Sequence, residues 1–124
     1  MDVPRLQEEQ VCVELDPSVM TSSPVEASTI SGAFQHGRLV NLAEMHQVDL
    51  VISGSVAVNR SGIRIGKGGG FADLEYGLAV AAGIVQHDTP IVGTVHQLQV
   101  LDQVLPWTPH DPCLAYFATP DALV

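Results

Sequence analysis

A glycine-rich stretch in the middle of the chain carries the residues best suited to chemistry. It runs Gly66-Lys67-Gly68-Gly69-Gly70, with four glycines in five residues, and joins a strand pattern to a helix pattern. Glycine admits positive φ angles and lets a ligand approach the backbone, and the free N–H groups at the start of a helix attract anions. The stretch therefore predicts an anion site, and phosphate is the anion that we expect there.

The stretch does not match either of two known phosphate-binding loop motifs. Neither Ser nor Thr follows Lys67, so the stretch is not a Walker loop, and Phe71 stands where a dinucleotide-binding G-x-G-x-x-G motif would have its third glycine. On composition alone, a surface loop with helix-entry glycines is an equal alternative. Lys67 favours a functional site, because it is the only lysine in the chain and lies inside the glycine cluster.

Length and composition indicate one globular domain over residues 1–124, with 46% hydrophobic residues. The sequence has no run of eighteen apolar residues and no signal-peptide pattern, so we expect neither a membrane span nor secretion, and a cytoplasmic location. Cys12 and Cys113 lie far apart without a C-x-x-C partner, which predicts buried thiols in a reducing compartment.

The charge balance is strongly acidic, with fourteen Asp and Glu against five Lys and Arg and a formal net charge of -9. Nucleic acid is therefore not an expected partner. Such a chain repels itself at low ionic strength, and molar salt screens the repulsion. We hypothesise a salt-adapted, halophile-like protein, with an ordinary acidic protein of low pI as the alternative.

The first third of the chain predicts one strand and a long connection. Apolar residues alternate from Val11 to Leu15, which is typical of a half-exposed strand. The segment from Ser18 to Asn41 is rich in turn-forming residues, and we expect an irregular connection with at most a short helix around Glu26 to Ile30. His36 and Arg38 are interpreted as solvated loop residues rather than ligand contacts.

The middle of the chain predicts the strands and turn that lead to the glycine-rich stretch. The continuous apolar run Val48–Ile52 is typical of a central strand covered on both faces, and it continues through small polar residues to Val58. Ligands of open α/β sheets bind outside such carboxyl ends. A turn over Asn59–Gly62 follows.

A helix is predicted from Gly70 to Gln86, with Gly77 and Gly83 inside it and an apolar face that packs across the sheet. A second central strand is expected at Ile91–Val95, parallel to the Val48–Ile52 strand and adjacent or nearly adjacent to it, and a last strand at Cys113–Ala118. Trp107 and Tyr116 are interpreted as packing residues. The predicted fold class is α/β with a mainly parallel sheet. The apolar face of the helix consists of Leu74, Leu78, Ala81, Ala82 and Val85.

Taken in order, these motifs resemble the 5-formyltetrahydrofolate cyclo-ligase (methenyltetrahydrofolate synthetase) family, and most closely its synthetase-domain-containing branch. The resemblance extends over most of Val3 to Val124. It implies a three-layer open sheet of the NagB/RpiA/CoA-transferase type. The motifs that carry it are Asp49-Leu50-Val51-Ile52, Gly54-Ser55-Val56-Ala57-Val58, Gly62-x-Arg64-x-Gly66-Lys67-Gly68-x-Gly70-Phe71-x-Asp73, Thr89-Pro90 and His110-Asp111.

In that family, the formyl oxygen of 5-formyltetrahydrofolate is phosphorylated by ATP in the presence of magnesium. Ring closure by N10 then gives 5,10-methenyltetrahydrofolate, ADP and phosphate. The resemblance thus implies ATP and a reduced folate as small-molecule partners, with magnesium as cofactor. It assigns catalytic roles to Arg64 and Lys67, and metal binding to Asp73 and Asp111. Nucleotide binding would involve Arg64, Gly66, Lys67, Gly68, Gly69, Gly70 and Phe71.

Each of these assignments has a plainer alternative from the residues alone. Asp73 is also a typical helix-entry acid, Asp111 a turn residue before a proline, and Arg64 a surface ion-pair partner. Two aspartates suffice for magnesium, which takes one or two carboxylates beside phosphate and water oxygens. The five histidines show no zinc-ligand spacing.

The sequence also departs from the family pattern. Lys67, Phe71 and Ala72 differ from the usual loop R-L-G-Y/R-G-x-G-Y-Y-D, and the family's N-terminal helical part has no counterpart ahead of Val3. We therefore expect a fragment or a misassigned start, weak Mg-nucleotide binding and little turnover. A non-catalytic nucleotide- or folate-binding homologue, or a fragment that serves only in assembly, stays as the alternative. The oligomeric state is left open.

Overall fold

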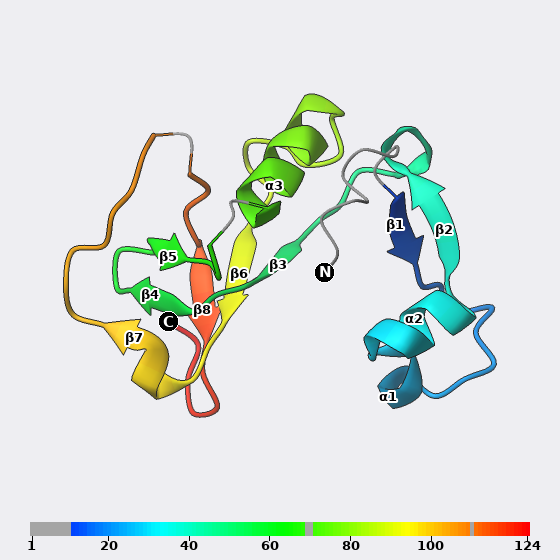
Figure 1. Cartoon of the computed structure of the whole chain (residues 1–124), viewed down its shortest axis with the longest axis horizontal. Coiled ribbons are helices and arrows are strands. Elements are labelled where there is room, and N and C mark those ends of the chain that lie inside the picture. The colour runs from blue at the N-terminus through cyan, green and yellow to red at the C-terminus, as the bar shows by residue number, and fades with distance from the viewer. Residues whose placement is uncertain (1–10, 69–70, 110) are drawn as a thin grey trace. The chain divides into compact units, whose positions relative to one another are not determined.

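The computed structural model describes residues 11–68, 71–109 and 111–124. The chain divides into two compact units, Met1–His46 and Gln47–Val124 (Figure 1). The first unit contains β1 (Val11–Glu14), α1 (Pro24–Ala27), α2 (Ile30–His36), β2 (Arg38–Asn41) and η2 (Leu42–Glu44). The second contains β3 (Val51–Gly54), β4 (Ala57–Asn59), β5 (Arg64–Ile65), α3 (Phe71–Ala81), β6 (Ile91–Thr94), η3 (Gln97–Gln99), β7 (Val100–Leu101) and β8 (Tyr116–Ala118).

In the first unit, the predicted N-terminal strand is confirmed as β1, which pairs antiparallel with β2. The register places Glu14 opposite Arg38, and Arg38 Nη2 lies 3.1 Å from Glu14 Oε1. This ion pair is exposed, so it contributes at most about 1 kcal/mol. The expectation of a mostly irregular segment from Ser18 to Asn41 is wrong, because two helices and β2 form within it.

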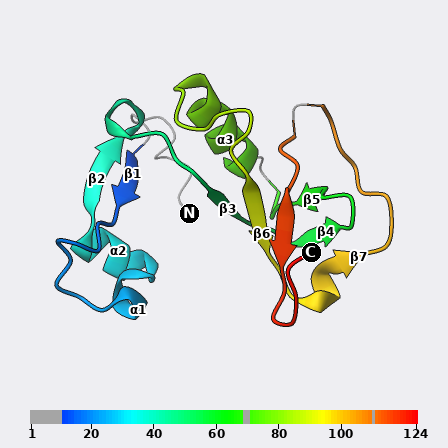
Figure 2. The same cartoon turned by 180° about the vertical axis from the view of Figure 1, so that it is seen from behind.

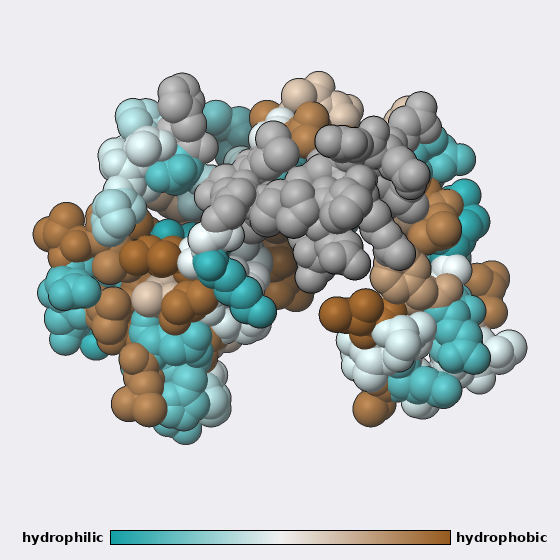
Figure 3. Space-filling view, in the orientation of Figure 1, coloured by the Kyte–Doolittle hydropathy of each residue, from teal (hydrophilic) through white to brown (hydrophobic). Residues whose placement is uncertain are grey.

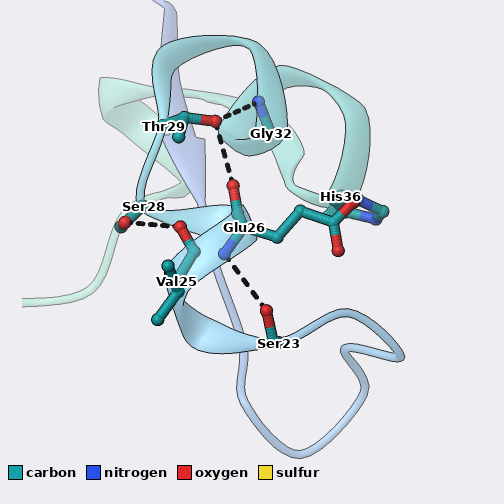
Figure 4. A network of polar contacts seen from close by, with 7 residues as sticks. All are labelled: Ser23, Val25, Glu26, Ser28, Thr29, Gly32 and His36. Atoms are coloured by element: carbon teal, nitrogen blue, oxygen red, sulfur yellow. Dashed lines mark hydrogen bonds and ion pairs between the residues drawn. The ribbon is translucent and has the colours of Figure 1, made fainter.

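Serine and threonine in this segment act as helix caps rather than as loop residues (Figure 4). Ser23 Oγ accepts a hydrogen bond from the Glu26 N–H, and Thr29 Oγ1 accepts one from the Gly32 N–H. The Thr29 hydroxyl also donates to the Glu26 carbonyl, and His36 Nε2 lies 3.6 Å from Glu26 Oε1. These side chains satisfy backbone groups at the helix ends and thereby favour two short helices over a coil.

The parallel sheet of the second unit has the strand order β3-β6-β8 (Figures 1 and 2). Val51 pairs with Ile91 in parallel register, which confirms that the two predicted strands are adjacent and parallel. Among the described strands β3 has β6 as its one neighbour, and Ile52 is 67% exposed, so the expected central position is not confirmed for β3. The expected continuation to Val58 is also interrupted, because β4 belongs to a separate sheet.

This second sheet has the order β5-β4-β7, with β4 antiparallel to β5 and parallel to β7. Val58 of β4 is fully buried and packs with residues of the parallel sheet and of the segment before β8. On the face turned to the viewer, apolar and hydrophilic side chains lie beside one another over this part of the chain (Figure 3). The core therefore joins the two sheets. Its cluster consists of Val58, Ile91, Val95, Leu114 and Phe117.

Helix α3 is shorter than predicted and ends at Ala81. The Gly83 N–H donates to the Val80 carbonyl and the Ile84 N–H to the Ala79 carbonyl, and Gly83 has φ +75°. This is a Schellman motif, in which a left-handed glycine closes the helix end. Gly83 therefore terminates the helix that we expected it to continue.

The predicted apolar face of the helix is buried in part: Val85 is buried and Leu78 half-buried, whereas Ala82 is exposed and the side chain of Leu74 lies outside the described residues. Among the helix side chains that the structure describes, Tyr76 is the one that packs against the core cluster, whereas Ala81 is exposed. A Cβ placed on Gly77 would meet no heavy atom within 4 Å, so this glycine does not serve a close helix–sheet contact.

Several smaller predictions about the C-terminal part also need correction. The last strand, β8, is shorter than the predicted Cys113–Ala118, and Cys113 is exposed rather than buried. Trp107 and Tyr116 are 49% and 52% exposed, so the core aromatic is Phe117 instead. None of the helices in the described residues has the length and apolar character that a membrane crossing requires.

Candidate functional site

Strand β5 carries Arg64 and leads directly into the glycine-rich stretch. Arg64 pairs with Val58 of β4, and Ile65 pairs with Ala57. Because Val58 is fully buried in the core, β4 is a firm support for this short strand. Arg64 is half-buried, and its Nη1 would lie 3.7 Å from a Cβ placed on Gly66. The guanidinium group therefore lies beside the first glycine of the loop.

The predicted turn between β4 and β5 is confirmed, and Asn59 organises it. The Gly62 N–H donates to the Asn59 carbonyl. Asn59 Oδ1 accepts hydrogen bonds from the N–H groups of Ser61 and Ile63, at 3.0 and 3.1 Å. Asn59 is only 6% exposed, and its Nδ2 donates to the Gln103 carbonyl at 3.4 Å. A buried amide whose polar atoms are paired favours one conformation of the turn.

The described part of the loop is open to a ligand. Gly66 is half-buried, and Lys67 and Gly68 are exposed. Gly68 has φ +90°, and no heavy atom lies within 4 Å of the position that a Cβ would occupy there. Backbone that is left-handed and uncrowded can approach an anion closely. This geometry is compatible with the predicted phosphate site at Arg64, Gly66, Lys67 and Gly68, which stays a prediction.

Helix α3 begins at Phe71, directly after the glycine-rich stretch, as predicted. The positive end of its dipole therefore faces the loop region, which favours an anion. Gly69 and Gly70 lie outside the described residues. The same holds for the side chains of Phe71 and Asp73, so their predicted roles stay predictions.

Asp111 lies in a turn after β7. Its Oδ2 accepts a hydrogen bond from the Thr108 N–H at 2.8 Å, and its own N–H donates to the Thr108 carbonyl. One carboxylate oxygen thus holds the turn, as the plainer alternative expected. In the described residues, no group of three or more His, Cys, Asp or Glu side chains lies where it could hold a metal ion. The predicted magnesium site needs only two aspartates and stays a prediction.

A glycine links the Asp111 segment to the strand pair. The Leu114 N–H donates to the Gly62 carbonyl at 2.9 Å. Gly62 has φ +82°, and a Cβ there would lie 2.4 Å from the Leu114 carbonyl oxygen, so only glycine permits this approach. The contact lies two residues before Arg64 and three residues after Asp111, and it holds the two segments side by side.

The structure thus brings four of the predicted site residues together along one stretch: Arg64, Gly66, Lys67 and Gly68. His36 and Arg38 belong to the first unit, where they lie beside Glu26 and Glu14. A cavity of about 150 Å³ beside the β4–β5 turn is lined in part by Arg60, but residues 66–68 do not line it.

A second amide beside the site, Gln99 of η3, was not predicted from the sequence. Its Nε2 donates to the carbonyls of Ser55 and Val56, at 3.1 and 3.0 Å. The Val56 N–H in turn donates to the Ile65 carbonyl at 2.7 Å, just ahead of Gly66. No local pattern marks such a glutamine, whereas an asparagine that opens a turn, as Asn59 does, is a recognisable signal.

Comparison with known proteins gives one family and a set of relatives. A sequence model of the 5-formyltetrahydrofolate cyclo-ligase family matches residues 3–120. The methenyltetrahydrofolate synthase domain-containing protein of Bos taurus is 41% identical over 102 residues, which cover 80% of this chain and 26% of that protein. Its Homo sapiens counterpart is 40% identical over the same shares. The Danio rerio counterpart is 47% identical over 75 residues, 60% of this chain and 20% of that protein. The chain spans between a fifth and about a quarter of the length of these curated relatives.

Proposed function

The chain belongs to the 5-formyltetrahydrofolate cyclo-ligase family, and from this premise we propose that it binds ATP at the glycine-rich loop and converts 5-formyltetrahydrofolate to 5,10-methenyltetrahydrofolate. The observation that carries this proposal is the open, left-handed backbone at Gly68, with the Arg64 guanidinium beside Gly66. A polyphosphate fits such a stretch, because backbone N–H groups and fixed positive charge are what its oxygens require.

In this reaction the protein has little covalent chemistry to perform. In phosphoryl transfer, charge is spread over the oxygens of the transferred group, so positioning and electrostatic stabilisation dominate. Arg64 would hold a phosphate oxygen from the strand side, and Lys67 would add a second positive charge from the exposed side of the loop. Magnesium, held by Asp73 and Asp111, would neutralise phosphate charge when bound. Backbone donors of the loop would orient the nucleotide without moving a proton.

A second candidate function is nucleotide binding without turnover. It is favoured by Asp111, whose carboxylate oxygen is engaged by the Thr108 N–H of its own turn. A carboxylate that stabilises its turn gives up part of its capacity to hold a cation. The phosphate end of the site would still form in this case, because the hydrogen bonds between Thr108 and Asp111 stay within that turn.

The two functions are separated by one assay on the full chain. Protein is mixed with ATP, magnesium and 5-formyltetrahydrofolate, and the methenyl product is followed by its near-ultraviolet absorbance. We expect slow product formation that requires ATP and magnesium. Calorimetric binding of MgATP without product would select the second candidate, and absence of both would refute the proposal.

Two arginine variants that remove the same charge test whether the activity depends on the proposed site. Arg64→Gln is expected to lower product formation and MgATP affinity by roughly tenfold or more, since a charged hydrogen-bond partner of phosphate is lost. Arg38→Gln removes the same charge from the first unit, where Arg38 pairs with Glu14, and should change neither quantity. An equal effect of both changes would show that net charge, rather than a site, governs binding.

The finer expectations belong to the same proposal. They are the three-layer, mainly parallel sheet of the NagB/RpiA/CoA-transferase type, a reduced folate and MgATP as ligands, no nucleic-acid partner and a cytoplasmic location. The α/β content and the parallel sheet of the second unit are compatible with this fold.

A further inference from the structure

Strand β5 is very short, although it positions a predicted site residue. It consists of Arg64 and Ile65 alone, yet it places the arginine and sets the entry to the loop at Gly66. Two paired residues give a strand little stabilisation of its own, so its position depends on the contacts at its two ends. In this structure an amide side chain acts at each end.

Asn59 acts at the N-terminal end. Its Oδ1 accepts the Ile63 N–H at 3.1 Å, one residue before Arg64, and its backbone N–H donates to the Ile63 carbonyl at 2.9 Å. Toward β5, the Asn59 side chain is therefore an acceptor. Because this residue is 6% exposed, water cannot easily replace the lost bonds if the amide is removed.

Gln99 acts at the C-terminal end, through one intermediate. Its Nε2 donates to the Ser55 and Val56 carbonyls, and the Val56 N–H donates to the Ile65 carbonyl, one residue before Gly66. The Oε1 of Gln99 faces the other way and accepts from the His96 N–H at 2.7 Å, within η3. Toward β5, the Gln99 side chain is therefore a donor.

We propose that Asn59 and Gln99 are positioning residues of the phosphate site, which hold β5 at both ends and so set the place of Arg64 and Gly66. The inference rests on the proposed function, because it names residues that act on the nucleotide through the loop. Toward β5, the Asn59 side chain accepts hydrogen bonds and the Gln99 side chain donates them. Conversion of the amide to an acid should therefore preserve the contacts of Asn59 with β5 and disrupt those of Gln99.

The experiment converts each amide to the corresponding acid in the full chain. Asn59→Asp keeps both acceptor bonds and places one carboxylate oxygen toward the Gln103 carbonyl, where the amide donated at 3.4 Å. Gln99→Glu keeps its acceptor bond from His96 but places a carboxylate against two carbonyl oxygens. Each change adds one negative charge near the loop, so the net charge is matched, but the Asn59 carboxylate would face one carbonyl at 3.4 Å and the Gln99 carboxylate two, at 3.0 and 3.1 Å. Asn59→Ala, which removes every side-chain bond, completes the set.

Two readouts are measured for every variant: amide hydrogen exchange by NMR and MgATP affinity by calorimetry. In Gln99→Glu we expect faster exchange of the Val56 amide and an affinity roughly tenfold lower. In Asn59→Ala we expect the same loss of affinity, with faster exchange of the Ile63 amide. In Asn59→Asp both quantities should stay within about threefold of wild type, because the acceptor bonds persist.

Two controls separate positioning from general stability. The Val95 amide, which donates to the Ala118 carbonyl beside the core, should keep its protection in Gln99→Glu and Asn59→Asp. Its loss in Gln99→Glu would overturn the inference, because the residue would then hold the whole unit. Asp102→Asn breaks the exposed Arg60–Asp102 ion pair, which ties the same turn to the segment after β7, and should leave MgATP affinity unchanged.

The two proposals can fail separately. If the wild-type chain binds no MgATP, the proposed function fails, and the exchange of Val56 and Ile63 still decides whether the amides hold β5. If the wild-type chain binds MgATP and Gln99→Glu matches it in exchange and affinity, the inference fails and the proposed function stands. Equal losses of MgATP affinity in Asn59→Asp and Gln99→Glu would also overturn the inference, because an acceptor and a donor should respond differently to conversion into an acid.

Discussion

Gly68 is the residue on which the proposed phosphate contact depends most directly. Its φ of +90° is unfavourable for any side chain with a Cβ, and nothing within 4 Å would obstruct such a side chain sterically. The glycine is thus required by the backbone conformation and by ligand access, rather than by packing within the protein. Such a position can be changed with little effect on the core and a large effect on binding.

We predict that Gly68→Val removes measurable MgATP binding while the fold persists. A β-branched side chain disfavours the left-handed backbone and fills the path by which phosphate would approach. Affinity is measured by calorimetry and the fold by circular dichroism. Gly77→Ala is the control, since Gly77 lies in α3 and an added Cβ there also meets nothing within 4 Å. Wild-type affinity in Gly68→Val would refute the site assignment.

At the scale of the elements, α3 shows that two glycines of one helical pattern can have opposite roles. Gly77 lies inside the helix with open space around it, and Gly83 closes the helix with a left-handed backbone. Both are glycines in an apolar, helix-forming sequence. They are distinguished by the positive φ of Gly83 and by the hydrogen bonds from the Gly83 and Ile84 N–H groups to the Val80 and Ala79 carbonyls.

We predict that alanine at these two positions changes stability in opposite directions. Gly77→Ala should raise the free energy of unfolding by roughly 0.5–1 kcal/mol, because alanine has the higher helix propensity and leaves the unfolded chain with less freedom. Gly83→Ala should lower it by about 1–2 kcal/mol, because alanine must then adopt a left-handed conformation. Urea unfolding of both variants measures the difference. Stabilisation by Gly83→Ala would contradict the helix end described above.

For the whole molecule, the excess of negative charge is the dominant electrostatic property. Fourteen acidic residues stand against five basic ones. Two arginines of the described residues, Arg38 and Arg60, form exposed ion pairs with Glu14 and Asp102, which compensate little of the repulsion. Stability should therefore depend on how well salt screens the remaining charges.

We predict that the free energy of unfolding rises by on the order of 1 kcal/mol between roughly 0.1 and 1 M KCl, as the Debye length falls from about 10 to 3 Å. Chemical denaturation with urea at each salt concentration measures the rise. A triple variant, Asp49→Asn, Glu75→Gln and Asp88→Asn, removes exposed acidic groups and should show a smaller salt dependence. Equal stability at both salt concentrations would count against a salt-adapted protein.

Local sequence patterns were sufficient for the features that depend on neighbouring residues. The alternation from Val11 predicted β1, the apolar runs predicted β3 and β6 as parallel neighbours, and the turn signal at Asn59–Gly62 predicted the reversal before Arg64. The glycine cluster predicted an open loop ahead of a helix, and Gly68 shows that backbone. Each of these depends on side-chain period or on the conformational freedom of one residue, both of which can be read along the chain.

Other features were decided by partners distant in sequence. The apolar run at Val48–Ile52 was compatible with a central strand, yet β3 pairs only with β6 in the described sheet, because strand order depends on which strands pair and not on composition. Serine and threonine between Ser18 and Asn41 indicated a loop until their hydroxyls were placed at helix ends. Gln99 contacts carbonyls more than forty residues away. Only the folded chain brings such groups within hydrogen-bonding distance, so no local pattern could have identified them.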